Sequence, residues 1–268
     1  MTSGMTKALA VLPLIAALAA CGGGGDHASN DKPAGPQGTG DTNPSRVKAA
    51  FVKGTAARYV LTTSTTQSAG RLDAFEQQTT GEVITMNGHA LSGSDRAIVD
   101  IAGDPAFAIG RWSKGTAVIA SSTKTIGATG TSVHYAVYNA ADAFPTSGGF
   151  TCDAGQFTTP TLEEAPGTEL GQAKGSAALS FDASGAQLDA SITVTLADGS
   201  SGTESATGRK LGAPTMITYT GGMLSGSSGL QLAVGQGVDA SKQLVSVAYV
   251  VKVGASKYRG VAMFSCSK

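Results

Sequence analysis

Charged residues are scarce in this sequence of 268 residues. Only 14% of the chain is Asp, Glu, Lys or Arg, and the two signs balance at 19 residues each. Proteins that bind DNA or RNA carry clusters of Lys and Arg that neutralise phosphates, and anionic lipid heads attract similar clusters. The sequence has no such cluster. Its composition therefore argues against nucleic acid as a partner and against attachment to a membrane by surface charge.

Aromatic residues are also few. Phe, Trp and Tyr make up 6% of the chain, and Trp112 is the single tryptophan. Transmembrane β-barrels need two girdles of aromatic side chains and apolar outer faces about ten residues long. The sequence offers neither, which argues against a membrane-spanning barrel. We interpret Trp112 as a side chain that fills a core, in preference to an exposed binding aromatic.

Histidine and cysteine, which often carry catalysis or metal ions, number three each. No Gly-x-Ser-x-Gly nucleophile elbow occurs. Two Ser-x-x-Lys matches in the predicted folded part, at Ser121 and Ser265, lie in strand-like or terminal sequence, where residues three apart point to opposite faces. His134 lies in alternating sequence and is interpreted as a structural histidine. His89 follows the turn signal Asn87–Gly88 and is expected to be exposed.

Acidic residues do not form a convincing site either. Glu163 and Glu164 are adjacent in a segment bounded by Pro160 and Pro166, and we expect them in a solvated loop. The Asp-containing turns lack the repeated Asp spacing of calcium loops. We therefore predict no catalytic residue, no metal and no cofactor, and we do not expect an enzyme.

Alternation of apolar and polar residues is abundant. Residues 175–182 and 187–197 each place their apolar side chains on one face, and residues 182–185 between them have turn chemistry, which predicts a hairpin. Residues 245–253 and 258–266 predict a second hairpin. Further strands are predicted near residues 58–63, 81–87, 106–112, 131–138, 148–157, 203–209, 214–224 and 229–235.

Many short strands separated by turns, together with 37 glycines, indicate a curled sheet. We predict an all-β fold over residues 47–268. It would contain a small antiparallel β-barrel of about eight strands, best placed at residues 105–268, and additional strands nearer the N-terminus. Residues 64–80 are ambiguous, and residues 71–77 are a candidate for a short helix.

The N-terminus has the features of an export signal. Lys7 is followed by an apolar segment from Ala8 to Ala20, which is too short to span a bilayer. The segment ends in Leu18-Ala19-Ala20-Cys21, which resembles the lipobox of bacterial lipoproteins. The resemblance implies removal of residues 1–20 and attachment of acyl chains such as palmitate at Cys21. The alternative is an ordinary secretory signal whose cleavage site lies beside a cysteine.

Residues 21–46 are rich in Gly and Pro and have no apolar period, so we predict a flexible tether. Its root-mean-square reach would be on the order of 25–30 Å. The residue after Cys21 is Gly22 and not Asp, which is similar to the signal for passage to the outer membrane.

Cys152 and Cys266 are the other two cysteines. Because export leads to an oxidising compartment, we predict that they form a disulfide. Each follows a phenylalanine by two residues, Phe150 and Phe264, which suits neighbouring inward-facing positions. The alternative is two separate buried thiols.

Three short segments occur in an order that resembles transferrin-binding-protein-like surface lipoproteins, the group that includes relatives of factor H binding protein. They are Ile109-Gly110-Arg111-Trp112, His134-Tyr135-Ala136-Val137 and Phe144-Pro145-Thr146-Ser147-Gly148. The resemblance covers roughly residues 105–268. It implies a compact barrel at the outer membrane that captures a host or nutrient macromolecule through its loops. It identifies no ligand-contact residue in this chain.

The expected function is that of a lipid-anchored, non-catalytic binding or surface-interaction module of the outer membrane. One alternative is a lipoprotein that faces the periplasm and has a structural or envelope-assembly role. A third is a hydrolase of envelope or extracellular polymers, which requires a cleft with converging Asp, Glu or His side chains.

Overall fold

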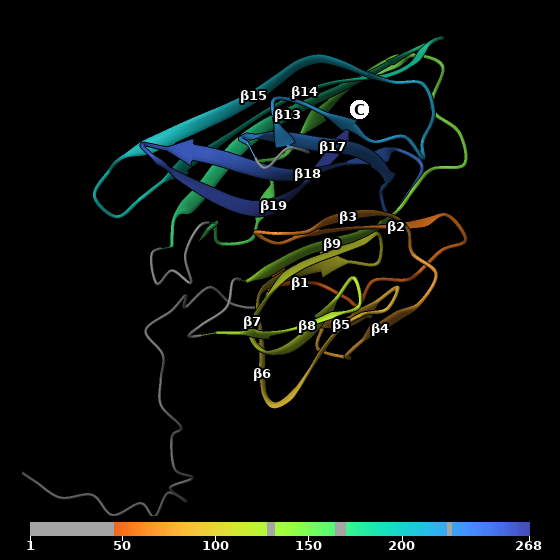
Figure 1. Ribbon diagram of the computed structural model, residues 1–268. Coiled ribbons are helices and arrows are strands. Elements are labelled where there is room, and N and C mark those ends of the chain that lie inside the picture. The colour runs from red at the N-terminus through yellow and green to blue at the C-terminus, as the bar shows by residue number, and fades with distance from the viewer. Residues whose placement is uncertain (1–45, 128–131, 164–169, 224–226) are drawn as a thin grey trace, which may run out of the picture. The chain divides into compact units, whose positions relative to one another are not determined.

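The computed structural model describes residues 46–127, 132–163, 170–223 and 227–268. These residues form nineteen β-strands and no α-helix. The strands make two sheets, a half-barrel nearer the N-terminus and a nearly closed antiparallel barrel (Figure 1). The predicted fold class is therefore confirmed. The predicted signal peptide, Cys21 and all but the last residue of the predicted tether lie outside the described residues.

The half-barrel has the strand order β3-β2-β9-β7-β6-β5-β4. β1 pairs in parallel with β6, and β8 extends β7 as a hairpin. The strands are β1 (Arg46–Val47), β2 (Ala57–Thr62), β3 (Gln67–Arg71), β4 (Phe75–Gln77), β5 (Val83–Met86), β6 (His89–Asp104), β7 (Phe107–Ile119), β8 (Ser122–Ile126) and β9 (Val133–Asn139).

The barrel has the strand order β15-β14-β13-β10-β19-β18-β17-β16, and β11 and β12 also pair with β19. Its strands are β10 (Gly148–Cys152), β11 (Gln156–Phe157), β12 (Thr161–Leu162), β13 (Gln172–Asp182), β14 (Gly185–Thr195), β15 (Ser201–Leu211), β16 (Thr218–Tyr219), β17 (Gly229–Gln236), β18 (Lys242–Val253) and β19 (Ser256–Ser267). The Arg209 side chain bridges the edges of β15 and β16, donating to Thr218 Oγ1 at 3.2 Å and to the Tyr219 carbonyl at 2.7 Å.

The two predicted hairpins are confirmed. β13 pairs with β14, and its turn has the Ser184 amide donating to Asp182 Oδ1 at 2.7 Å and Gly185 at a φ of 123°. β18 pairs with β19 around Gly254, whose φ is 60°. A positive φ is easily adopted by glycine because it has no Cβ.

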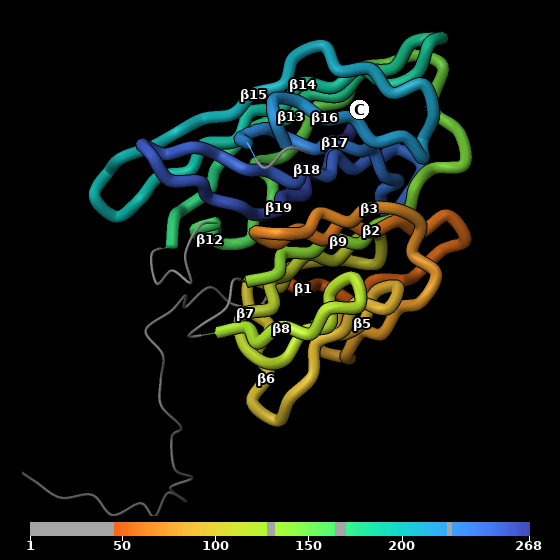
Figure 2. The backbone as a smooth tube through the Cα atoms, viewed as in Figure 1, coloured from red at the N-terminus to blue at the C-terminus, as the bar shows by residue number. Residues whose placement is uncertain are grey.

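The apolar side chains form three separate cores. The barrel and the half-barrel each enclose one, and the third lies between the two sheets, which Figure 2 shows as adjacent layers. β18 and β19 take part in two of the cores, because one face points into the barrel and the other packs on the half-barrel. The residues of this interface core are Val60, Ala102, Ala106, Phe107, Ile109, Ala136, Tyr138, Met223, Ala233, Leu244, Ala248, Val250, Val261 and Met263.

Three expectations about the elements are wrong. Residues 71–77 form no helix, but the end of β3 and the whole of β4. The long strand β6 was not expected, because register shifts between Ser92 and Ala102 interrupt its alternation. The barrel begins at Gly148 and not at residue 105, since β7, β8 and β9 pair inside the half-barrel.

Each sheet contains a glycine that lies under a tyrosine of the neighbouring strand. Gly110 pairs with Tyr135 in the half-barrel, and Gly260 pairs with Tyr249 in the barrel. A Cβ on either glycine would lie 2.2 Å from the tyrosine hydroxyl oxygen. Both rings are fully buried, so they have little room to move away.

We expect Gly260→Ala to lower the free energy of unfolding by about 1–3 kcal/mol, because overpacking a dense core forces side chains out of their rotamers. Urea denaturation measures the change. Gly149→Ala is the control, since a Cβ there meets nothing within 4 Å. Equal stability of the two variants would contradict this account of the glycine.

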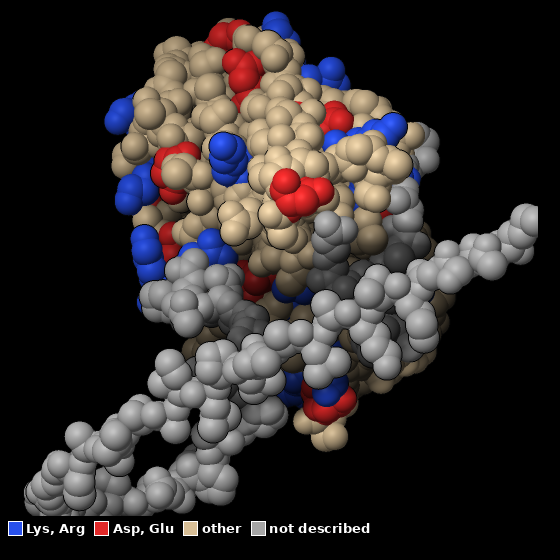
Figure 3. All heavy atoms as spheres, turned by 90° about the vertical axis from the view of Figure 1, so that its left-hand side faces the viewer, with Lys and Arg blue, Asp and Glu red and all other residues tan. Residues whose placement is uncertain are grey.

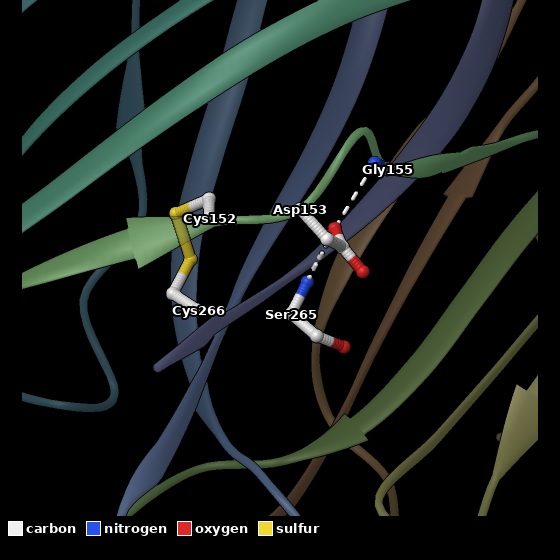
Figure 4. The surroundings of a disulfide bond; sticks show 5 residues. All are labelled: Cys152, Asp153, Gly155, Ser265 and Cys266. Atoms are coloured by element: carbon white, nitrogen blue, oxygen red, sulfur yellow. Dashed lines mark hydrogen bonds between the residues drawn. A yellow bond between two sulfur atoms is a disulfide. The ribbon is translucent and has the colours of Figure 1, made fainter. Parts of the chain in front are cut away.

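The predicted disulfide between Cys152 and Cys266 is present, with a sequence separation of 114 residues. The cysteines face each other across the antiparallel pair β10–β19 (Figure 4). Beside the bond, Asp153 Oδ1 accepts from the amides of Gly155 and Ser265, both at 3.0 Å. The carboxylate therefore holds the chain where it turns away from β10.

Candidate functional site

The segment Gln156–Glu163, here called the strap, runs along β19 and contacts both sheets. Its strands β11 and β12 pair with β19 of the barrel. Its Thr159 donates to Asp100 of the half-barrel from both the backbone amide and the hydroxyl, each at 2.9 Å. The strap therefore links the two sheets by polar contacts, in addition to the apolar contacts of the interface core.

Asp100 is bound on the half-barrel side as well. Arg111 Nε donates to Asp100 Oδ2 at 2.7 Å, and Arg111 Nη1 donates to Ser132 at 3.1 Å. Asp100 has a φ of 56°, in the left-handed region that residues other than glycine seldom occupy. This backbone conformation lies at a register shift in the pairing of β6 with β7. The Asp100 carboxylate thus accepts hydrogen bonds from three protein groups, which are Arg111 Nε and the amide and hydroxyl of Thr159.

His134 lies fully buried between the half-barrel and the strap. Its Nδ1 is 2.8 Å from Thr158 Oγ1, and its Nε2 is 2.8 Å from Thr161 Oγ1. Both ring nitrogens therefore have partners, which confirms the interpretation of His134 as a structural histidine. Burial holds the pKa of His134 well below its usual range, and the positive charges of Arg111 and Arg259 act in the same direction.

A buried ion pair completes the contacts of the strap. Arg259 Nη2 donates to Glu163 Oε1 at 2.6 Å, and Arg259 Nη1 donates to the hydroxyl of Thr62 in the half-barrel. The side chains of Arg259 and Glu163 are only 3% and 6% exposed, and Lys257 Nζ is 3.9 Å from Glu163 Oε2. The expectation of a solvated Glu163 is wrong, because the carboxylate is buried against Arg259. The prolines near Glu163 in the sequence do not indicate this distant partner. Glu164 is outside the described residues.

Arg259 and its neighbours were not identified from the sequence, although a signal exists. Arg259 is a charged residue on the face of β19 that Val261 and Met263 share. A charge within an apolar strand face indicates a buried partner, because an unpaired buried charge is very unfavourable. The identity of that partner depends on contacts more than ninety residues away.

The remaining residues considered from the sequence have ordinary structural surroundings. His89 was expected to be exposed, but it is buried, and its Nδ1 accepts a hydrogen bond from the Ala120 amide at 3.2 Å. Trp112 is buried as predicted, in the half-barrel core, and donates to the Val83 carbonyl at 2.8 Å.

The Ser-x-x-Lys matches at Ser121 and Ser265 do not form reactive pairs. Ser121 lies in the turn between β7 and β8 with a φ of 67°, and Lys124 donates to Thr65. At the other match, Ser265 lies in β19, and Lys268 Nζ lies 5.7 Å from the ring centroid of Phe150. In both cases the lysine contacts a residue other than the serine of its match.

A cavity of about 340 Å³ opens at the opposite end of β9 from His134. We call it the rim pocket. Its walls come from the segment before β2, the β6–β7 turn, the segment after β9 and the β17–β18 turn. The lining residues are Val52, Gly54, Thr55, Ala56, Pro105, Ala106, Asn139, Ala140, Asp142, Gln236, Gly237 and Val238.

Asn139 holds the wall of the rim pocket in place. Its Oδ1 accepts from the Gly54 amide at 2.8 Å, and its Nδ2 donates to the Val52 carbonyl at 3.0 Å. A Cβ on Gly54 would lie 2.9 Å from Asn139 Oδ1, so a glycine suits this close approach. Val52 and Val238 are 63% and 49% exposed, which makes them two of the most exposed large apolar side chains described.

Comparison of the chain with protein-family models, with curated protein sequences and with solved structures found no match. The described residues contain no group of three or more His, Cys, Asp or Glu side chains that would hold a metal ion. None of them forms a helix with the length and hydrophobicity that crossing a membrane requires. On the face seen in Figure 3, charges of both signs are interspersed among uncharged residues.

The buried histidine predicts how stability depends on pH. The folded state keeps His134 neutral, whereas the unfolded imidazole takes up a proton near pH 6.5. Because the unfolded state then binds more protons, the free energy of unfolding should fall as the pH drops below about 6.5. One such group gives a slope of up to about 1.4 kcal/mol per pH unit. Urea denaturation at a series of pH values measures it.

His134→Gln should make this slope shallower, since glutamine has no titrating group. His89→Gln is the comparison, because burial also lowers the pKa of His89, but less strongly. A slope that persists unchanged in His134→Gln would show that another group is responsible.

Proposed function

We propose that this protein is a lipoprotein of the outer membrane, anchored by acyl chains on Cys21, whose folded domain binds a partner without altering it chemically. The observation that carries the non-catalytic binding role is the composition of the rim pocket. Its lining has one carboxylate, Asp142, and no imidazole, thiol or amine. The buried groups suited to acid–base chemistry, such as His134 and Glu163, instead have partners at the strap.

The anchor is supported by the lipobox-like sequence that ends at Cys21. A stable anchor requires two acyl chains or one chain with a second signal, and a mature lipoprotein cysteine supplies more than one chain. The likeness to transferrin-binding-protein-like surface lipoproteins belongs to the proposal too. The nearly closed barrel of eight strands agrees with the domain that this likeness implies.

Labelling of cells with a palmitate analogue tests the anchor. The proposal predicts label on the full chain and none on Cys21→Ala, which should also leave the membrane fraction. Protease treatment of intact cells then distinguishes the two sides of the membrane. Loss of the domain supports display at the surface, whereas survival supports the alternative of a periplasm-facing lipoprotein.

Capture experiments test the binding role. The tagged full chain is incubated with host fluids and with envelope extracts, and bound material is compared with that of a Val52→Asp/Val238→Asp variant. A partner that is retained unmodified by the native chain and lost by the variant supports the proposal. Release of a shortened or chemically altered partner would contradict it and favour the hydrolase alternative.

A further inference from the structure

The rim pocket has walls of two kinds. Val52, Pro105, Ala140 and Val238 supply aliphatic surface, and Val52 and Val238 lie at the exposed margin. None of the lining residues is aromatic, so the pocket offers no platform on which a sugar ring or nucleobase would stack. Its size lies at the lower end of the range of about 300–1,000 Å³ that is typical of small-ligand sites. The pocket therefore suits a small ligand with an aliphatic part.

The polar groups of the rim pocket determine the sign of charge that it accepts. Asp142 is the one charged lining residue, and no Lys or Arg is among them. Among the described residues, the carboxylate of Asp142 has no hydrogen bond or ion pair. Thr55 and Gln236 likewise have side chains without a described partner and add further polar atoms. Asn139 differs, because both ends of its amide are used in holding Gly54 and Val52.

We infer that the rim pocket binds a primary alkylammonium group, with the ammonium at Asp142 and the alkyl chain against Val52, Pro105 and Val238. An ammonium donates three hydrogen bonds and accepts none, which matches a pocket whose lining includes one carboxylate, the hydroxyl of Thr55 and the amide of Gln236. A phosphate or carboxylate ligand would meet the charge of Asp142 with no basic residue to offset it. The inference rests on the proposed binding function and names the chemistry that its site recognises.

Such a group has two sources, a free alkylamine and the lysine side chain of a partner protein. Ligand-observed NMR with the full chain in detergent measures binding of two kinds of probe, a series of linear amines from ethylamine to pentylamine and Nα-acetyl-lysine amide. Each methylene that contacts the aliphatic wall should tighten binding by up to about fourfold. Stronger binding of the lysine derivative than of pentylamine assigns the site to a protein partner, and the reverse assigns it to a free amine.

Asp142→Asn should weaken pentylamine binding about fivefold, which corresponds to roughly 1 kcal/mol for an exposed ion pair. Glu76→Gln is the matched control, since Glu76 is an exposed carboxylate outside the pocket and should leave binding unchanged. Pentanol and pentanoate, which have the same chain length without the ammonium, should bind more weakly than pentylamine.

Equal binding of pentylamine and pentanol, or equal effects of the Asp142 and Glu76 variants, would overturn the inference. The capture experiment keeps this result separate from the proposed function. If the Val52→Asp/Val238→Asp variant loses a captured partner while no amine binds, the pocket is a binding site but not for an alkylammonium group.

Discussion

Replacement of Arg259 by methionine is expected to lower the free energy of unfolding by about 3–5 kcal/mol. Arg259 is 3% exposed and holds Glu163 through a hydrogen bond of 2.6 Å. Without the guanidinium, the Glu163 carboxylate stays buried with Lys257 Nζ as its nearest cation, 3.9 Å away. An isolated buried charge is far less favourable than a paired one, because water no longer solvates it. Urea denaturation with the disulfide intact measures the loss.

The double variant Glu163→Gln/Arg259→Met should regain much of this stability, since it leaves neither charge unpaired. Arg71→Met is the control for losing a surface ion pair. Arg71 and Asp73 are 2.9 Å apart, but their side chains are 71% and 69% exposed, and such pairs contribute about 1 kcal/mol or less. If Arg259→Met costs no more than Arg71→Met, the strap does not depend on the buried pair.

Removal of the disulfide by Cys152→Ala/Cys266→Ala is expected to lower the free energy of unfolding by about 4–5 kcal/mol, because the unfolded chain regains the entropy that closing a loop of this length had removed. The bonded cysteines are 114 residues apart in the sequence. Holding the ends of so long a loop together removes much conformational entropy from the unfolded chain. Its position adds a local effect. β10 pairs with β19 at only two positions, Thr151 with Ser267 and Cys152 with Cys266. Without the bond, this junction of the barrel is held by few contacts.

Two measurements check this prediction. Urea denaturation gives the change in free energy, and amide hydrogen exchange should show lost protection at the end of β19 before the rest of the barrel. Cys21→Ala keeps both paired cysteines and should leave stability unchanged. A loss below about 1 kcal/mol for the paired substitution would show that the entropy of this loop is already restricted in the unfolded chain.

Local alternation was a sound guide to the barrel strands. β14 alternates from Ala186 to Val194 with inward residues fully or nearly buried, as predicted. Alternation did not predict β6, because Asp100 and the residues near Gly93 interrupt the pairing of that strand with β7. Residues 64–80 were ambiguous because β3 and β4 are short edge elements, and the Asn87 side chain fixes the chain between them by accepting from the Asp73 and Ala74 amides.

The candidate sites were harder to predict than the strands. The disulfide was predicted from the two cysteines that remain after Cys21, together with the expected export to an oxidising compartment, so the prediction needed no knowledge of the fold. The contacts of the strap could not be predicted from residue counts, because His134, Glu163 and Arg259 lie far apart in the chain. The rim pocket likewise combines four turns and segments whose residues show no common motif.

By itself, the sequence determined that this chain folds as antiparallel sheet with hairpins at residues 182–185 and near Gly254, because side chains that alternate with period two separate a dry face from a wet one within a few residues. The tertiary structure alone decided that β18 and β19 are buried on both faces, that Glu163 is paired and not solvated, and where a cavity remains. Those outcomes depend on how two curved sheets pack against each other, and no local pattern of residues specifies which distant groups then meet.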